Sequence, residues 1–371
     1  MKNLILLTIL ISMLISCSSQ EDATYTIEEI DSVKHIHNHA ASWGEEPRIE
    51  LEFVQKIGIL EGSDDNYMLF RPNDAAVDSK GNIYISESGN YRVQKYSRDG
   101  KFIRTIGTKG MGPGEFSGWV RCIDILNDTL YVAHTNNIIS KLSLEGKELG
   151  RFRGYHAVTY LRHFSTGEFV QRCSEGYRYK QPYVPDEVSL VLVLKPDGER
   201  RKIGKPIFLE NAIATEDINY VMPEIDNHDN IYITFFSCNR LDKYTIDGTH
   251  LFSSDRPLNF TVPDRPEWVI TDRKDSLQPR YPVVSGGIAV DSENRIWIST
   301  PVRYTPGFTV NGEERNAEYD LHIFNYDGIF LGSIPMPEQW EDFKIRIFGD
   351  RLFLIEENRL MTVHEYRIID K

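Results

Sequence analysis

Cysteine is scarce in this 371-residue sequence, which contains only four. Cys17 lies next to an apolar N-terminal run, so Cys122, Cys173 and Cys238 remain for the folded part of the chain. An odd number of cysteines gives no disulfide framework, and the spacing of these three fits no zinc motif. We therefore expect small buried residues on strands, with one disulfide and one free thiol as the alternative.

Familiar catalytic signatures and an excess of positive charge are also absent. The sequence has no G-x-S-x-G, no phosphate-binding loop and no H-E-x-x-H. Its 42 Lys and Arg residues are outnumbered by 55 Asp and Glu residues, for a formal net charge of −13. An acidic chain repels phosphate backbones, which argues against nucleic acid as the main partner.

One long hydrophobic run is present, and it lies at the N-terminus. Lys2 precedes an apolar segment from Leu4 to Ile15, which is too short to span a membrane comfortably as a mature helix. The run ends in "LISC", which resembles the bacterial lipoprotein signal, where a cysteine after small residues receives lipid. A plain signal peptide with a chance cysteine is the alternative.

The resemblance to a lipoprotein signal sets the expected organisation of the N-terminal part. Residues 1–16 are then a signal peptide, Cys17 is the lipidation site, and residues 17–44 are a lipid-anchored tether. The mature protein would be exported and anchored to the outer membrane by lipid only. Acidic residues after the cysteine resemble a surface-export signal, so both the periplasmic side and the cell surface stay open.

A turn followed by an alternating strand recurs along the rest of the chain. The stretch "VDSKGNIYIS" combines a polar turn with a β-branched and aromatic strand, which is typical of a hairpin. Similar stretches begin at Val77, Ile125, Phe164, Ile225, Val290 and Ile347. A second tight turn follows most copies, at Asp99-Gly100, Glu145-Gly146, Asp197-Gly198, Asp247-Gly248 and Asp327-Gly328. Each repeat is therefore predicted to be four antiparallel strands, with the period of propeller blades.

The last copy predicts how the ring is closed. From Lys344 onward only three strands remain before the chain ends. The stretch "IELEFVQKIG", from Ile49 to Gly58, has the shape of a fourth strand and precedes the first copy. An N-terminal strand that completes the last blade removes an exposed edge. We therefore predict an all-β fold, a six-bladed β-propeller of four-stranded antiparallel blades, over residues 45–371.

Val77 to Gly107, together with the glycine-rich "GTKGMGPGEFSG" from Gly107 to Gly118, resembles the NHL repeat. With the lipoprotein-like start, the chain resembles six-bladed β-propeller lipoproteins of Gram-negative bacteria. The resemblance is loose for the third and sixth copies. It implies a fold and an exported location, and it implies no particular reaction.

Long loops are expected on one face of the propeller only. Turns between strands one and two, and between three and four, are short and share one face. The insertions fall on the opposite face, at Thr108–Val120, Ser174–Glu187, Lys205–Val221, Arg256–Ser285 and Pro301–Glu318. Loops on a rigid scaffold commonly carry function, so this face is the predicted binding surface. Neutral drift in loop length is the alternative.

Basic, aromatic and amide side chains would surround the channel on that face. The candidate ligand-binding residues are Arg71, Arg121, His134, Arg162, His163, Arg172, Tyr177, Asn239, Arg303 and Tyr304. Such a mouth suits an anionic or sugar-like ligand. Alternatively, each arginine pairs with a neighbouring carboxylate.

Two functions follow as hypotheses. In the first, a monomeric, membrane-anchored module binds a small molecule, glycan or protein through the long-loop face, without catalysis or cofactor. In the second, a metal-dependent, lactonase-like hydrolase or lyase holds a divalent ion through His134, His163 and Glu224. The three alternate histidines of "HIHNHA", His35 to His39, would share one face of a strand. We interpret them as part of the tether rather than as a metal site.

Overall fold

The computed structural model describes most of the chain beyond the N-terminal run. The described residues are 23–62, 64–134, 137–154, 158–173, 188–195, 198–263, 265–271, 276–303, 318–337 and 343–371. Cys17, Tyr177 and Tyr304 lie outside these ranges. Within them, no helix is long and apolar enough to cross a bilayer.

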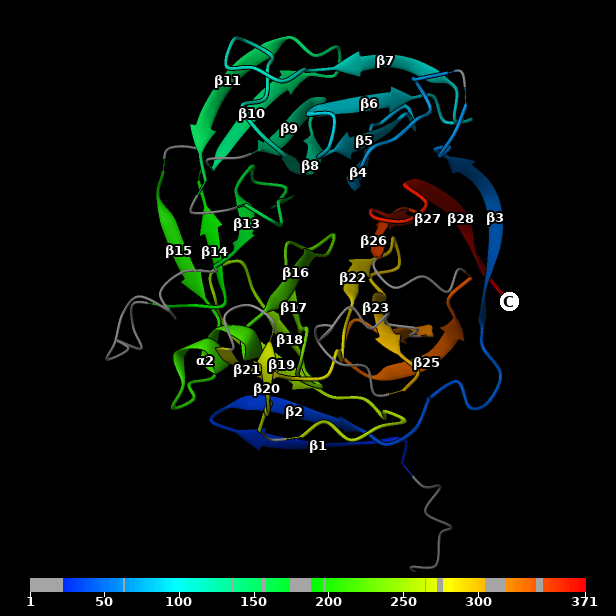
Figure 1. Ribbon diagram of the computed structural model, residues 1–371. Coiled ribbons are helices and arrows are strands. Elements are labelled where there is room, and N and C mark those ends of the chain that lie inside the picture. The colour runs from blue at the N-terminus through cyan, green and yellow to red at the C-terminus, as the bar shows by residue number, and fades with distance from the viewer. Residues whose placement is uncertain are drawn as a thin grey trace, which may run out of the picture.

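The predicted propeller is confirmed, and its blades are antiparallel sheets arranged around a central axis (Figure 1). The first blade contains β4 (Pro72–Val77), β5 (Ile83–Glu87), β6 (Arg92–Tyr96) and β7 (Phe102–Ile106). The second contains β8 (Val120–Leu126), β9 (Thr129–His134), β10 (Ile138–Ser143) and β11 (Glu148–Arg153). The third contains β12 (Arg162–His163), β13 (Phe169–Arg172), β14 (Val191–Leu194) and β15 (Arg200–Ile203).

The remaining blades follow the same order from the axis outward. The fourth contains β16 (Val221–Ile225), β17 (Ile231–Phe235), β18 (Leu241–Tyr244) and β19 (His250–Ser254). The fifth contains β22 (Gly287–Val290), β23 (Ile296–Pro301), β24 (Tyr319–Phe324) and β25 (Phe330–Pro335). The sixth contains β26 (Phe343–Phe348), β27 (Arg351–Glu356) and β28 (Thr362–Asp370), followed in space by β3 (Ile49–Ile57).

The N-terminal strand β3 is the fourth strand of the sixth blade. It pairs antiparallel with β28 from Ile49 opposite Asp370 to Ile57 opposite Val363. The first strand of this blade, β26, also packs beside β4 of the first blade. The two ends of the repeat array are therefore neighbours in space.

Repeated aspartates shape the turns between the first two strands of several blades. Asp78 accepts hydrogen bonds through Oδ1 from the backbone N–H groups of Lys80 and Asn82, and through Oδ2 from the Tyr84 hydroxyl. Asp226 and Asp291 make the same backbone contacts in later blades. These aspartates therefore form turns, as the sequence indicates.

Apolar clusters between neighbouring blades form the core. One cluster joins Tyr84 of the first blade to Leu130 of the second, and five others fill the remaining interfaces around the ring. Cys122 and Cys173 belong to the cluster between the second and third blades, and both are free thiols, as is Cys238. Face-to-face packing of blades is the expected way to bury both surfaces of a four-stranded sheet.

The segment expected to be a tether contains an ordered hairpin. Strands β1 (Tyr25–Ile30) and β2 (Val33–Asn38) pair antiparallel, and β2 also pairs parallel with β19 at the outer edge of the fourth blade. Asp31 and Ser32 form the tight turn, with φ angles of 51° and 65°. Consecutive positive φ angles suit the hairpin turns that match strand twist. Residues 25–38 therefore extend the fourth sheet.

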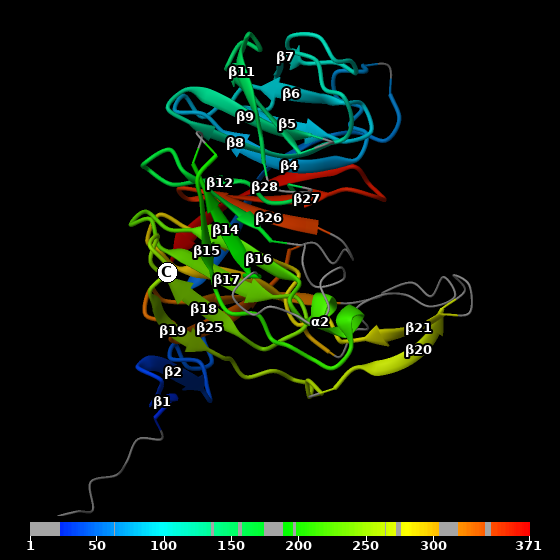
Figure 2. The ribbon, with the colours of Figure 1, turned by 90° about the vertical axis from the view of Figure 1, so that its left-hand side faces the viewer.

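Two of the predicted insertions carry secondary structure on the long-loop face. Lys205–Val221 contains helix α2 (Ala212–Ile218), where the Asn211 side chain caps the N-terminus. Arg256–Ser285 contains the hairpin of β20 (Glu267–Thr271) and β21 (Ser276–Arg280). Figure 2 shows α2 and this hairpin on the same side of the propeller. Ser174–Glu187 and most of Pro301–Glu318 lie outside the described residues.

Candidate ligand-binding site at the channel mouth

A cavity of about 270 Å³ lies where the central channel opens on the long-loop face. Its lining comes from several blades: Pro72, Tyr160, Tyr220, Met222, Phe236, Val283, Gly286, Ser299, Tyr319, Lys344, Ile355, Glu357 and Asn358. A neighbouring cavity of about 320 Å³ shares Tyr160, Tyr220, Lys344 and Glu357 with it, and adds Arg71, Trp119 and Arg121. The two cavities therefore form one hollow, which we call the mouth.

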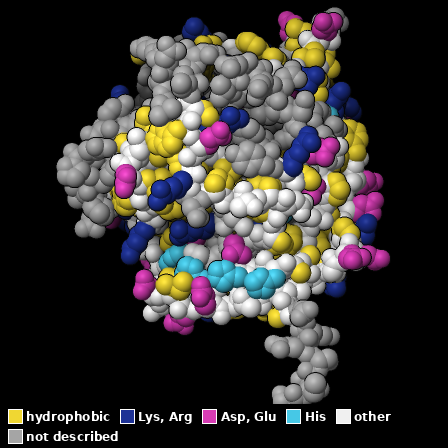
Figure 3. All heavy atoms as spheres, turned by 60° about the horizontal axis from the view of Figure 1, so that its bottom comes forward, with side chains coloured by type: hydrophobic (Ala, Val, Ile, Leu, Met, Phe, Trp, Pro, Cys, Tyr) yellow, Lys and Arg dark blue, Asp and Glu magenta, His cyan; other side chains and the backbone are white. Residues whose placement is uncertain are grey.

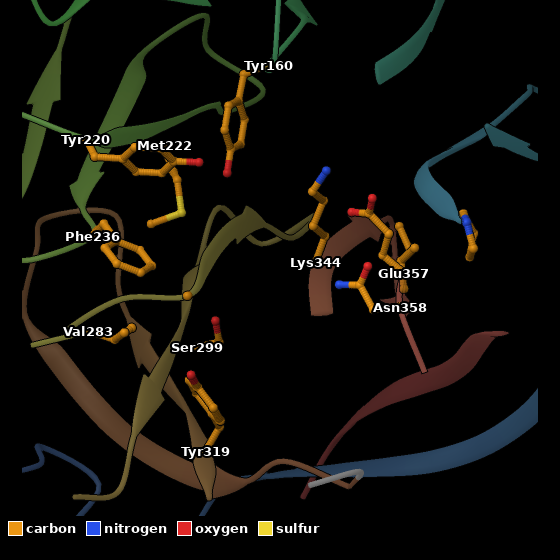
Figure 4. Close-up of a pocket in the computed structure, with 13 residues that line it drawn as sticks. Tyr160, Tyr220, Met222, Phe236, Val283, Ser299, Tyr319, Lys344, Glu357 and Asn358 are labelled. Carbon is orange, nitrogen blue, oxygen red and sulfur yellow. The ribbon is translucent and has the colours of Figure 1, made fainter. Parts of the chain in front are cut away.

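The mouth has chemically different walls (Figure 4). Met222, Phe236 and Val283 form an apolar side, while the hydroxyl groups of Tyr160 and Tyr220 point into the space opposite Lys344. An apolar wall combined with a few convergent polar groups is the usual composition of a small-molecule site.

Three cations at or beside the mouth form no ion pair within the described residues: Arg121, Arg172 and Lys344. The Arg172 guanidinium lies over the Tyr220 ring, 4.0 Å from its centroid, and Arg121 lies 5.8 Å from the Trp119 ring. The Lys344 ammonium donates to the backbone and side-chain oxygens of Asn73, at 3.0 and 2.5 Å. A fourth cation, Arg71, reaches Glu357 at 3.5 Å.

The positive charge near the mouth lowers the pKa of Tyr220. Burial would raise the pKa of this phenol, but the Arg172 guanidinium and the Lys344 ammonium outweigh burial and lower it below 10.0. Its neighbour Tyr160 has a raised pKa, chiefly because the phenol is buried and secondly because Tyr220 lies close. Tyr220 is therefore the more acidic hydroxyl of the pair, and Tyr160 stays a hydrogen-bond donor.

Arg71, Arg121 and Arg172 thus lie at or beside the mouth, where the sequence placed them. Tyr160, Tyr220, Lys344 and Glu357 were not among the sequence-predicted residues. Three of them could have been found from the repeat, because they lie at or just before the innermost strand of a blade. Tyr160 precedes β12, Tyr220 precedes β16 and Lys344 lies at the start of β26. Arg71 and Arg121 occupy the corresponding positions in the first two blades.

Arg162 and Glu224 lie deeper on the axis, in a network of buried charges. Arg162 Nε donates to Glu224 Oε2 at 2.9 Å, and Arg162 Nη1 lies 3.5 Å from Asp74 Oδ2. Arg346 Nη1 donates to the other Asp74 oxygen at 2.9 Å and reaches Asp124 at 3.7 Å. The alternative of pairing with a carboxylate therefore holds for Arg162, whose guanidinium is held by Glu224 and Asp74.

His163 is held by the same network. Its Nδ1 is 3.1 Å from Asp124 Oδ2. Burial would raise the pKa of the Asp124 carboxyl, but His163, Arg346 and Arg162 together lower it to about 2. Asp124 is therefore a stable anion, and it orients the His163 ring.

The other predicted residues lie away from the mouth. His134, at the end of β9, is buried between the hydroxyls of Ser117 and Ser140, at 3.3 and 3.1 Å. Asn239 donates to the Arg256 carbonyl oxygen and lines a different groove, beside the β1–β2 hairpin. Arg303 is the last residue of the described range 276–303.

The metal set considered for an enzyme is not brought together. Glu224 is bonded to Arg162, His163 to Asp124, and His134 to two serines. Across the described ranges, no three His, Cys, Asp or Glu side chains are already grouped to hold a metal ion.

Comparison with known proteins supports the fold. Residues 71–96 match the model of the NHL repeat. No curated protein matches the chain. A Bacteroides fragilis protein whose name marks it as exported superposes with a TM-score of 0.59 at 11% identity, covering 87% of this chain and 96% of that one. A member of the DUF4221 family from Bacteroides vulgatus gives 0.58 at 11%, covering 87% and 99%.

Solved enzymes with similar architecture are more distant. Virginiamycin B lyase from Staphylococcus aureus superposes with a TM-score of 0.46 at 14% identity, covering 86% of this chain and all of its own. At 11% identity the two Bacteroides structures support the fold alone and say nothing about chemistry.

Proposed function

We propose that the protein is an exported, lipid-anchored propeller that binds a small anionic ligand, of the sugar-acid class, at the mouth. Binding needs no catalysis in this proposal. The observation that carries it is the pair of cations Arg121 and Lys344 in the mouth with two tyrosine hydroxyls, and a third cation, Arg172, stacked on one of those tyrosines. Among the described residues these cations have no ion-pair partner, and such a concentration of positive charge is unexpected on a chain of net charge −13. It favours an anion.

The chemistry of the walls supports a ligand with a ring as well as a charge. The carboxylate of a sugar acid would accept hydrogen bonds from Lys344 and Arg121, which differ in shape but both donate. Tyr160 would donate to a ring hydroxyl, since its raised pKa keeps it protonated. The faces of Trp119 and Phe236 would pack against the ring carbons.

Export and anchoring rest on the N-terminal sequence, which lies outside the described residues. Cys17 after the apolar run supplies the lipidation site, and the NHL-like propeller follows it. Replacing Cys17 with Ala should abolish incorporation of labelled palmitate and release the protein from the membrane fraction. Continued labelling of the Cys17→Ala variant would contradict the anchor without touching the ligand proposal.

Calorimetric titration tests ligand binding directly. Glucuronate and galacturonate should bind the wild-type protein, whereas glucose and galactose, which have the same ring without the carboxylate, should bind at least tenfold more weakly. Arg121→Gln and Lys344→Gln should each weaken binding of the acid about tenfold or more, because each removes a charge-assisted hydrogen bond.

The matched control is Arg98→Gln, which removes one positive charge from the short-turn face. It should leave the affinity unchanged, since an exposed charge on the far face is screened at physiological salt. Equal binding of acid and neutral sugar, or equal weakening by Arg98→Gln, would show that the mouth does not select an anion.

A further inference from the structure

The β1–β2 hairpin presents a row of histidines on the surface of the fourth blade. In β2, His35 and His37 alternate with Ile36 and Asn38, so their side chains share one face. Ile36 and Asn38 are buried against the propeller, which leaves the histidine face outward. Figure 3 shows histidine side chains gathered in a row, with acidic side chains beside them.

His37 lies between two carboxylates. Its Nδ1 is 2.7 Å from Asp255 Oδ2, and its Nε2 is 3.1 Å from Glu28 Oε1. Both ring nitrogens of His37 therefore face carboxylate oxygens.

The surroundings of His37 resemble those of a metal-bound histidine, with one ring nitrogen held by a carboxylate and the other able to face a metal ion. A ligating histidine usually donates its second ring N–H to a carboxylate, which fixes its orientation. Asp255 occupies that position on Nδ1, and its other oxygen is held by the Asn38 backbone N–H at 3.1 Å. Two donor atoms about 2.1 Å from a tetrahedral zinc ion lie about 3.4 Å apart. Nε2 of His37 and Oε1 of Glu28 are close to that separation.

His35 supplies a third donor. It lies directly opposite Glu28 in the hairpin register, and cross-strand partners have Cβ atoms about 5 Å apart. A groove of about 540 Å³ is lined by His35, His37 and Asp255, so the site is open to solvent. His39, by contrast, has its Nε2 held by the Thr26 hydroxyl at 3.1 Å.

We propose that His35, His37 and Glu28 form a surface site for a divalent transition metal such as Zn²⁺, with Asp255 as the positioning residue. Two imidazoles and one carboxylate suit zinc, and water completes the coordination. The metal replaces the proton on His37 Nε2. The His35 side chain turns toward it, since three donors are not yet grouped in the described structure.

The site would connect the hairpin to the propeller. Its ligands lie on β1 and β2, whereas Asp255 follows β19 of the fourth blade. Bound metal should therefore stabilise docking of residues 25–38, because a ligand that binds only the docked form shifts the equilibrium toward it.

Calorimetry with Zn²⁺ on the untagged full-length protein is the first experiment. We expect one equivalent to bind the wild-type chain. His37→Gln, His35→Gln and Glu28→Gln should each lower the affinity at least tenfold, and Asp255→Asn by about 10- to 100-fold, as loss of such outer partners typically does. The control is His228→Gln, an exposed histidine in a turn of the same blade, which should bind normally.

A second measurement guards against simple loss of the hairpin. Hydrogen exchange of residues 25–38 without metal should show whether each variant still docks, and Glu28→Gln keeps the size of the side chain. Added Zn²⁺ should slow exchange of these amides in the wild-type protein and in His228→Gln, and much less in the His35, His37 and Glu28 variants. Absence of binding, or affinity unchanged in both His35→Gln and His37→Gln, would overturn the proposal.

Discussion

Arg162 on β12 donates from Nε to Glu224 Oε2 on β16 at 2.9 Å, although 62 residues separate the two in sequence. Both side chains are buried beside the propeller axis. Together with Asp74, Arg346 and Asp124, this pair links the first strands of five blades through charged groups. The axis is therefore filled by paired charges below the mouth.

Breaking this pair should be costly. Arg162→Met leaves the Glu224 carboxylate buried and without its cation, so we expect the free energy of unfolding to fall by about 3–5 kcal/mol. Urea denaturation measures it. The double variant Arg162→Met/Glu224→Met should lose less than the two single variants added together, because the second change removes the orphaned charge. A cost below about 1 kcal/mol for Arg162→Met would mean that the network adds little to stability.

His134 should make the protein sensitive to acid. Burial, and secondly the charge of Arg151, lowers its pKa from 6.5 to about 4 in the folded state. The unfolded chain therefore binds a proton first as the pH falls, and stability declines between pH 6.5 and about 4. The expected slope is at most about 1.4 kcal/mol per pH unit. His134→Gln should flatten the curve of unfolding free energy over that range, while the curve above pH 7 keeps its shape.

Tyr220 should be the first tyrosine of the mouth to ionise. Arg172 and Lys344 outweigh burial in setting its pKa, so the value lies below 10.0. Ultraviolet difference absorbance during an alkaline titration should show an early phenolate transition that disappears in Tyr220→Phe. Arg172→Gln should move this transition to higher pH. If Tyr220→Phe titrates like the wild-type protein, the charge of the mouth is not felt at this hydroxyl.

Asn38 should decide whether the N-terminal hairpin stays docked. Its Nδ2 donates to Ser254 Oγ and to the carbonyl oxygens of Asp255 and Gly328, and its Oδ1 accepts from the Phe330 backbone N–H at 2.8 Å. Asn38→Ala leaves these buried groups unpaired, at a cost of about 1–3 kcal/mol. Limited proteolysis should cut near residues 25–45 faster in this variant, with Asn66→Ala, in a turn before the first blade, as the control. Equal cleavage rates would show that docking rests on other contacts.

The repeat could be predicted from sequence because its determinants are local. Val77–Gly107 contains the alternating strands and Asp-containing turns that form one blade, and similar stretches recur along the chain. Counting these stretches gives the number of blades. It also shows that the last blade needs Ile49–Gly58 as its fourth strand. The hairpin at residues 25–38 was missed although Asp31-Ser32 separates two alternating runs. Its first strand is largely exposed, and such a polar pattern is also typical of a tether.

The mouth could be predicted only in part. Arg71 and Arg121 stand before or within first strands, and their position on the ring follows from the repeat. The partners of Arg162 come from blades whose residues lie 62 and 88 positions away, and no local pattern shows such long-range pairs. Arg172 stacks on Tyr220, and this contact depends on how two neighbouring blades pack.

The pairing of β3 with β28 fixes the order in which the molecule can be completed. Strand β3 lies near the beginning of the chain and can pair only after β28, which ends at Asp370, has been made. Until then the array is an open arc with unpaired edges at both ends, which are sites for association with other chains. Removal of β28 would thus leave β3 without its neighbour and the sixth blade with an open edge, much as removal of β3 itself would.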